Sequence, residues 1–307
     1  MSKKVIFIGG TSYSGSTLLD MILANDEKGF SLGEVKSYFY PTKKHHINPL
    51  CGCGNEDCNI PELINDIKLG NLYSKLFEKY PEIDFIIDSS KSPFWIYKQS
   101  KKLQKQGIDV KNVLIWKTPL ELAKSFYKRG RGDIWKKKWI EYHKRYFSFI
   151  KNYKTVKYKD LVSDSNVLKE LCEYLQIPFF IGKYNYWEKT HHTFFGNKSA
   201  KMHLYKNYNN KDEVISKIQR SYKFDNDENK QLGEIYYNQV NNPDFDIKVK
   251  KQIINDKDEF ESIIKTLAEN KTNSISPKLN FFGKNSYLVK AEFLLLYGRI
   301  YKLYYRK

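Results

Sequence analysis

The chain has 307 residues, of which 41% are hydrophobic and 16% aromatic, a composition that excludes a disordered protein. Its 53 lysine and arginine residues outnumber 35 acidic ones, and the net charge of +18 favours anionic partners, although a solvated lysine-rich surface gives the same balance. Because no apolar run approaches about 20 residues and four cysteines are too few for a disulfide-stapled secreted domain, we expect a cytoplasmic protein.

Short apolar segments alternate with helical patterns along the first 180 residues. Helices are predicted at Leu18–Ala24, around Pro93–Gln106, and after a cap formed by Asp164 or Ser165. Strands are predicted between them, at Val5–Gly10, Phe30–Gly33, Phe85–Asp88, Val113–Trp116 and Lys154–Tyr158. This alternation indicates an α/β fold of the P-loop type, in three layers, with a central parallel sheet flanked by helices.

Polar residues follow the ends of these predicted strands. They are Gly10–Thr17, Glu34, Ser89–Lys91 and Lys117. Ligands of open α/β sheets bind outside the carboxyl ends of the strands, so the sequence predicts one ligand crevice built from all four.

The segment Gly10-Thr-Ser-Tyr-Ser-Gly15-Ser16-Thr17 has the spacing of a nucleotide-binding P-loop. Its glycines allow backbone N–H groups to surround an anion, and the next helix presents its positive end. In nucleoside triphosphatases a lysine follows the second glycine and reaches the outer phosphates, whereas this chain has Ser16. The loop therefore suits one phosphate bearing a sulfate better than a triphosphate with Mg²⁺.

The second half of this loop resembles a known motif. Ser14-Gly-Ser-Thr-Leu-Leu19 resembles the 5′-phosphosulfate loop of sulfotransferases that use 3′-phosphoadenosine-5′-phosphosulfate (PAPS), above all the bacterial and carbohydrate types. The resemblance covers roughly residues 3–202, and its other motifs agree in order and spacing. They are Leu32-Gly-Glu34, a Gly-Glu motif shared with tyrosylprotein sulfotransferases, Cys51-Gly-Cys-Gly-x3-Cys58, Asp88-Ser-Ser-Lys-Ser-Pro93, Trp116-Lys-Thr-Pro with Ser125, Tyr158-Lys-Asp-Leu161, and His192 with Gly196-Asn197.

The resemblance implies a set of residues that contact PAPS. Amides from Ser14 to Thr17 would hold the 5′-phosphate, while Lys117, in place of the more usual arginine, and Ser125 would bind the 3′-phosphate. The complete cofactor-binding set is Tyr13, Ser14, Gly15, Ser16, Thr17, Lys117, Ser125, Tyr158, Lys198 and Lys201.

The resemblance also implies catalytic residues. Glu34 is the candidate general base, with a structural carboxylate as the alternative reading. His191 and His192 are rival bases, because cytosolic small-molecule sulfotransferases use histidine. The family's loop usually carries Lys or Arg where this chain has Tyr13, so a cation must reach the sulfate from elsewhere. Lys91 is the best candidate for that cation.

Cys51, Cys53 and Cys58, with His45 and His46 nearby, leave three readings open: a zinc site, a disulfide, or free structural thiols. Beside PAPS as co-substrate, we expect no metal cofactor.

Residues beyond about 200 are harder to interpret, with helical patches near Val214–Tyr222, Gln231–Val240 and Phe260–Ala268. We expect a sulfotransferase domain over 1–285 and a basic aromatic helix over 286–307. That helix would pack on the domain, or else make peripheral contact with an anionic membrane.

The predicted function is transfer of a sulfuryl group from PAPS to a hydroxyl acceptor, a carbohydrate or glycolipid. The alternative is a P-loop kinase or NTPase-like phosphotransferase, for which Asp88 would be a Walker-B-like residue. A nucleic-acid-binding protein is a third class, but the sequence shows neither a basic stripe nor a known binding motif, so no nucleic-acid partner is expected.

Overall fold

The computed structural model describes residues 2–47, 49, 51–55, 57–67, 69–197, 200–201, 243–269, 292–298 and 301–302. Its centre is a sheet of five parallel strands in the order β2-β3-β1-β4-β5, which places β1 in the middle. The strands are β1 (Lys4–Gly9), β2 (Gly29–Gly33), β3 (Phe85–Lys91), β4 (Asp109–Trp116) and β5 (Lys154–Lys157).

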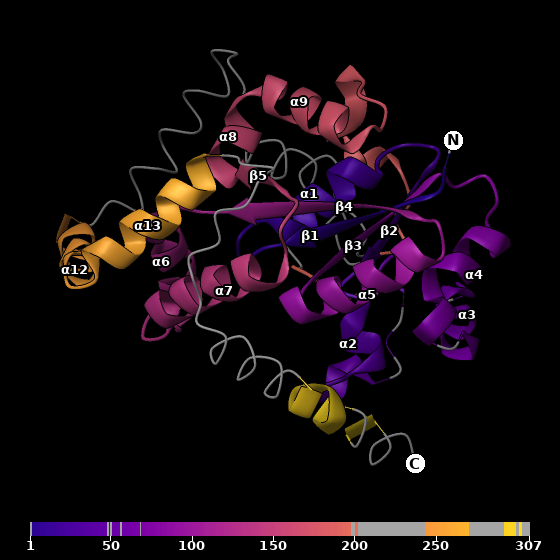
Figure 1. Ribbon diagram of the computed structural model, residues 1–307, viewed down its shortest axis with the longest axis horizontal. Coiled ribbons are helices and arrows are strands. Elements are labelled where there is room, and N and C mark those ends of the chain that lie inside the picture. Colours follow the sequence, from indigo (N-terminus) through magenta and orange to yellow (C-terminus); the bar gives the residue numbers. More distant parts are fainter. Residues whose placement is uncertain are drawn as a thin grey trace.

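Helices cover both faces of this sheet (Figure 1). The labelled helices of the described residues are α1 (Ser16–Ala24), α2 (Lys36–Phe39), α3 (Ile60–Asp66), α4 (Leu72–Lys79), α5 (Pro93–Lys105), α6 (Pro119–Tyr127), α7 (Trp135–Phe149), α8 (Tyr158–Ser163), α9 (Ser165–Leu175), α12 (Pro243–Ile254) and α13 (Lys257–Ala268).

The core has two halves because side chains alternate along each strand. Val5 and Phe7 of β1 point into one half, which α5 and α7 cover, and Ile6 and Ile8 point into the other, which α1, α8 and α9 cover. A strand buried on both faces must be apolar throughout, which is why these strands are continuous hydrophobic runs. The predicted three-layer α/β fold is confirmed.

The predicted strands are all present, with shifted ends. β3 runs three residues further than predicted and ends at Lys91, and β4 begins at Asp109, four residues earlier. The Asp164 side chain caps α9 by accepting a hydrogen bond from the Asn166 amide at 2.9 Å, as one of the two predicted caps.

Helices α12 and α13 pack against α6 and α7. Phe260 of α13 lies on Trp139 of α7, with ring centroids 5.0 Å apart, and Glu259 forms an ion pair with Lys144. The predicted patches 214–222 and 231–240 lie outside the described residues, as does most of the predicted C-terminal helix, of which 292–298 is helical. The predicted boundary at residue 285, between the domain and the C-terminal helix, stays a prediction. None of the described helices is long and apolar enough to cross a membrane.

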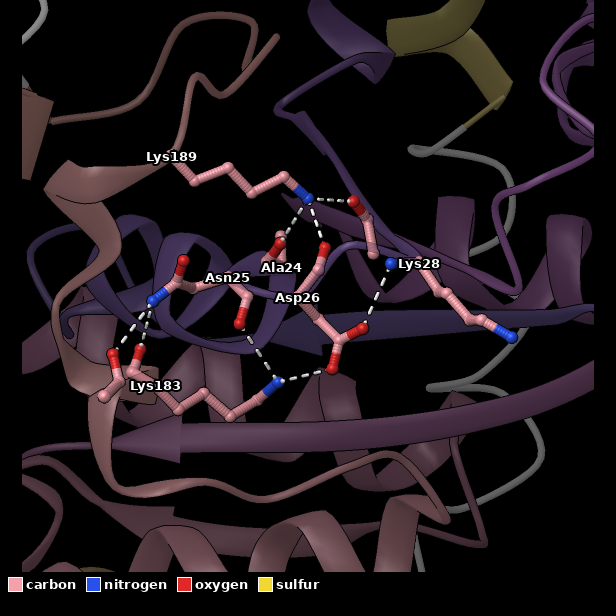
Figure 2. A network of polar contacts seen from close by, with 8 residues as sticks. Ala24, Asn25, Asp26, Lys28, Lys183 and Lys189 are labelled. Carbon is pink, nitrogen blue, oxygen red and sulfur yellow. Dashed lines mark hydrogen bonds and ion pairs between the residues drawn. The ribbon is translucent and has the colours of Figure 1, made fainter.

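Lys189 closes the C-terminal end of α1 (Figure 2). Its ammonium donates hydrogen bonds to the carbonyl oxygens of Ala24 (3.1 Å) and Gly29 (2.7 Å), and to that of Asp26. The Ala24 carbonyl belongs to the last residue of α1 and also accepts from the Asp26 amide at 2.8 Å, while the other two carbonyls lie in the turn that follows. Burial lowers the pKa of Lys189 to about 8.

Lys183 completes the same network from a fully buried position (Figure 2). Its ammonium lies 3.4 Å from both the Asn25 carbonyl and the Asp26 carboxylate. The side-chain amide of Asn25 donates to the carbonyls of Gly182 and Lys183 at 3.2 and 2.9 Å. The network fixes residues 182–189 against α1, from where the chain continues to pair with the end of β2 through Phe194 and Gly33.

Candidate functional site

The carboxyl ends of all five strands meet at one pocket of about 830 Å³. The glycine loop follows β1, Glu34 follows β2, Lys91 ends β3, Lys117 follows β4 and Tyr158 follows β5. All of these line the pocket, as the strand-end pattern predicts.

The loop leaves the first turn of α1 open toward the pocket. Gly15 is the residue before the helix, with φ 103°, and among the described residues no side chain caps the free N–H groups of the first turn. A Cβ atom on Gly15 would lie 2.4 Å from the Tyr158 ring, so both the backbone angle and the space require glycine. The open amides and the helix dipole make this turn a ready anion site.

Ser14 differs from the expected arrangement. Its amide donates to the Thr11 carbonyl at 3.2 Å, and its side chain is fully buried outside the pocket lining. Tyr13, Gly15, Ser16 and Thr17 do line the pocket. The amides left open toward the pocket therefore begin at Gly15, and Ser14 closes the turn internally.

A cationic group lies on the β4 side of the loop. Lys117 Nζ lies 3.3 Å from Ser125 Oγ and 4.2 Å from the centre of the Tyr158 ring. Burial lowers the pKa of Lys117 to about 8. The Arg129 guanidinium donates to the Ser125 carbonyl at 2.7 Å and covers the Tyr13 ring at 4.3 Å.

Arg129 and Arg131 both line the pocket, and neither belongs to a motif predicted from the sequence. A signal was present. The chain has six arginines among its 53 basic residues, and two of them stand at 129 and 131, next to Gly130 and Gly132 in the turn between two helices.

Glu34 and Lys91 form an ion pair on the β3 side of the loop. Lys91 has φ 61°, a left-handed conformation that is uncommon for a lysine. The Tyr142 hydroxyl donates to the Lys91 carbonyl at 2.6 Å and accepts from the Gly10 amide at 2.6 Å, which ties Lys91 to the glycine loop.

Strained backbone is concentrated at this pocket. Four non-glycine residues of the described chain have positive φ angles, and three of them, Tyr13, Lys91 and Phe195, line the pocket. Such conformations cost about 1–3 kcal/mol each and persist mainly where surrounding structure holds them for a function.

The pocket is strongly cationic. Glu34 is the single carboxylate among the described residues that line it, against six basic side chains: Lys43, Lys91, Lys117, Arg129, Arg131 and Lys201. Asp88, the Walker-B-like candidate, is fully buried and accepts hydrogen bonds from Tyr73 (2.6 Å), Trp95 (2.8 Å) and the Ser90 amide (2.7 Å). Burial raises its pKa. An aspartate held in this way does not face a metal in the pocket.

The two rival histidines lie outside the pocket lining. His191 Nε2 lies 2.9 Å from the Tyr186 carbonyl, and His192 faces the cysteines. His46 lines the pocket instead, where burial lowers its pKa to about 4.

The segment after His192 returns to the glycine loop. The Asn197 amide donates to Thr17 Oγ1 at 3.0 Å, and a Cβ atom on Gly196 would lie 2.8 Å from the same oxygen. Lys201 lines the pocket, while Lys198 lies outside the described residues.

No protein-family model matches the chain, and no curated protein matches it. Among solved structures, the chain is similar to the sulfotransferase domain from the curacin biosynthetic pathway, with a TM-score of 0.46 and 16% identity over 77% of this chain and 98% of that one. It is also similar to the sulfotransferase domain of the Synechococcus PCC 7002 olefin synthase, with a TM-score of 0.45 and 17% identity over 77% and 96%. Both neighbours are sulfotransferase domains.

Proposed function

We propose that the protein transfers a sulfuryl group from PAPS to a hydroxyl acceptor. One observation carries the proposal: the open helix end lies between two separate cationic groups, Lys91 from β3 and Lys117 with Arg129 from the β4 side. A donor with a phosphosulfate at one end and a ribose 3′-phosphate at the other presents two anions to one loop. The absence of a basic residue at position 16, where the chain has serine, fits this donor better than a nucleoside triphosphate.

The residues suggest a direct transfer. The first-turn amides of α1 would hold the 5′-phosphate, and Lys117, Ser125 and Arg129 would hold the 3′-phosphate. The acceptor oxygen forms a bond to sulfur while the bond from sulfur to the 5′-phosphate oxygen breaks, and Glu34 takes the acceptor proton. Adenosine 3′,5′-bisphosphate leaves. The ion pair between Lys91 and Glu34 would break, and the Lys91 ammonium would then neutralise charge on the sulfuryl oxygens.

A second hollow, of about 280 Å³, supports an acidic or amphipathic acceptor. It shares Ser12 and Lys91 with the main pocket, and Lys36, Arg145 and Leu294 line its wall. Cations beside apolar side chains suit a carbohydrate that carries a charge or a lipid. Phe293 and Leu296, in the same segment as Leu294, are exposed. The proposal therefore includes peripheral contact of this segment with a membrane.

Thermal-shift titration tests the donor. Adenosine 3′,5′-bisphosphate at about 100 times its Kd should stabilise the protein by about 2.7 kcal/mol, and 5′-AMP should stabilise it less because it lacks the second anion. Equal or stronger stabilisation by ATP·Mg²⁺ would favour a phosphotransferase, and stabilisation by an oligonucleotide alone would favour a nucleic-acid-binding protein. Transfer of labelled sulfate to a panel of cell-envelope glycans then identifies the acceptor.

Lys91→Ala tests the assignment of the sulfate cation. Because Lys91 is proposed to act on charge that develops in the transition state, its loss should lower kcat far more than donor affinity. Equal losses of both, or of neither, would remove Lys91 from this role.

A further inference from the structure

Three cysteines and a histidine form a compact group apart from the pocket. Cys51, Cys53, Cys58 and His192 each place one ligand atom so that all lie within 4.8 Å of one another. His192 Nδ1 lies 3.5 Å from Cys51 Sγ and 3.4 Å from Cys58 Sγ. All three cysteines are free thiols.

From this arrangement we infer that Cys51, Cys53, Cys58 and His192 bind one zinc ion. With Zn–S bonds of about 2.3 Å and Zn–N bonds of about 2.0 Å, a tetrahedral site places nitrogen about 3.5 Å from each sulfur. The distances from His192 Nδ1 to the sulfurs of Cys51 and Cys58 match this value. Three thiolates and one imidazole are a ligand set that selects zinc over magnesium or calcium. Four protein ligands leave no open position, so the metal is structural and takes no part in the reaction.

The surroundings hold these ligands in place. The His192 ring stacks on Phe30 at 5.7 Å and 13°, which fixes its orientation. The Gly52 amide, between two of the cysteines, donates to the Thr193 carbonyl at 3.1 Å. A Cβ atom on Gly52 would lie 2.1 Å from that oxygen, so the cysteine loop approaches the histidine segment as closely as glycine allows.

The zinc would join two segments that lie 134 residues apart in the chain, measured from Cys58 to His192. The histidine segment goes on to the pocket: the Phe194 carbonyl accepts from the Glu34 amide at 2.8 Å, and the Phe194 amide donates to the Leu32 carbonyl at 3.2 Å. The metal would therefore fix the edge of the pocket that carries Glu34. This consequence rests on the proposed function, whereas the metal site itself does not.

The first test uses the wild-type full-length protein. Elemental analysis after purification without added metal should find about one zinc per chain. Chelation should release it and lower Tm by roughly 10 °C, and Co²⁺ should restore Tm and give the visible bands of a tetrahedral thiolate site. Less than about 0.1 zinc per chain, with no uptake of Co²⁺, would overturn the proposal.

Thiol labelling followed by mass spectrometry gives an independent result in the same protein. Cys51, Cys53 and Cys58 should resist alkylation until a chelator is added, while Cys172, buried in the other half of the core, should resist it until the protein is unfolded. Free alkylation of all three before chelation, or a mass that is two hydrogens lower because of a disulfide, would contradict the zinc site.

Variants assign the ligands. Cys58→Ser and His192→Gln should lose zinc, while Cys172→Ser and His45→Gln should keep it, since neither control residue belongs to the group. Retention of zinc by both ligand variants would overturn the assignment. Binding of adenosine 3′,5′-bisphosphate is measured separately, so a protein that holds zinc but binds no bisphosphate would refute the proposed function and leave the metal site standing.

Discussion

The two ends of helix α1 are built in opposite ways. At the C-terminal end, Lys189 donates to three backbone carbonyls and Lys183 meets the Asn25 carbonyl and the Asp26 carboxylate (Figure 2). At the N-terminal end, Gly15 takes a left-handed conformation, and no side chain in the described part of the chain caps the free amides.

This difference between the two ends indicates that the C-terminal end of α1 serves stability and the N-terminal end serves ligand binding. Carbonyl oxygens at a buried helix end and in the turn after it are costly to leave without donors, so lysines of the protein itself donate to them. Amides that face a cationic pocket can be satisfied by an anion from outside, and any internal cap would compete with it. We therefore expect changes at the N-terminal end to affect ligand affinity and changes at the C-terminal end to affect stability.

Gly15→Ala should have the largest effect on affinity. The added Cβ atom would meet the Tyr158 ring at 2.4 Å and force the backbone from its φ of 103°, so the first-turn amides would no longer converge. We expect affinity for adenosine 3′,5′-bisphosphate, measured by calorimetry, to fall by at least roughly 100-fold, as for loss of several charge-assisted hydrogen bonds.

Gly107→Ala is the matched control. Gly107 has a similar φ of 71°, and a Cβ atom there meets nothing within 4 Å. It should lose about 1 kcal/mol of stability and keep its affinity. An equal loss of affinity in both variants would mean that backbone strain alone, rather than the shape of the loop, explains the result.

Lys117→Ala should weaken bisphosphate binding by roughly 50-fold, the value of a charge-assisted hydrogen bond in a buried site. Its affinity for 5′-AMP, which has no 3′-phosphate, should change little. If both ligands lose affinity equally, Lys117 acts through the shape of the pocket and does not recognise the ribose phosphate.

Much of this site could be predicted from the sequence because parallel strands end at a common edge. An apolar run that stops at Gly9, Gly33 or Trp116 marks where the sheet ends, and the polar residue that follows must face the crevice. Glu34 and Lys117 were placed in this way. The short motifs at these strand ends are local in the sequence, so they can be identified without knowing which distant segments they contact.

The remaining features depend on contacts between distant segments. Nothing local shows that His192 leaves the pocket to face the cysteines, or that the Ser14 amide turns inward to Thr11. Helix α7 is different: it was not predicted, although Trp135, Trp139 and Tyr146 are buried at helical spacing, a pattern that indicates a helix.

Lys189→Met should affect stability instead of affinity. Methionine fills similar space but cannot donate to the carbonyls of Ala24, Asp26 and Gly29, so the free energy of unfolding should fall by about 2 kcal/mol in chemical denaturation. Lys28→Met, at an exposed lysine whose ammonium lies 3.2 Å from Asp84, is the control and should stay within about 0.5 kcal/mol of the wild type. Equal losses in the two variants would show that the network in Figure 2 adds nothing beyond a surface charge.

The pH dependence of binding should give the smallest effect and the finest comparison of the two ends. Burial lowers the pKa of Lys117 to about 8, so its ammonium is charged below that pH and becomes neutral above it. A 3′-phosphate is recognised by the charged form, so affinity should fall by about tenfold between pH 7 and 9, and binding near pH 8 should be accompanied by proton uptake. Calorimetry at pH 8 in two buffers of different ionisation enthalpy measures that uptake.

Lys189, at the other end of α1, has a pKa of about 8 as well, but its partners are backbone carbonyls that the ligand does not touch. Its protonation is therefore the same in the free and bound protein and cancels from the uptake. Lys117→Arg keeps its charge over the whole range, so its affinity should be independent of pH from 7 to 9. If this variant shows the same decline as the wild type, the titrating group belongs to the ligand or to another residue, and the assignment of the 3′-phosphate to Lys117 fails.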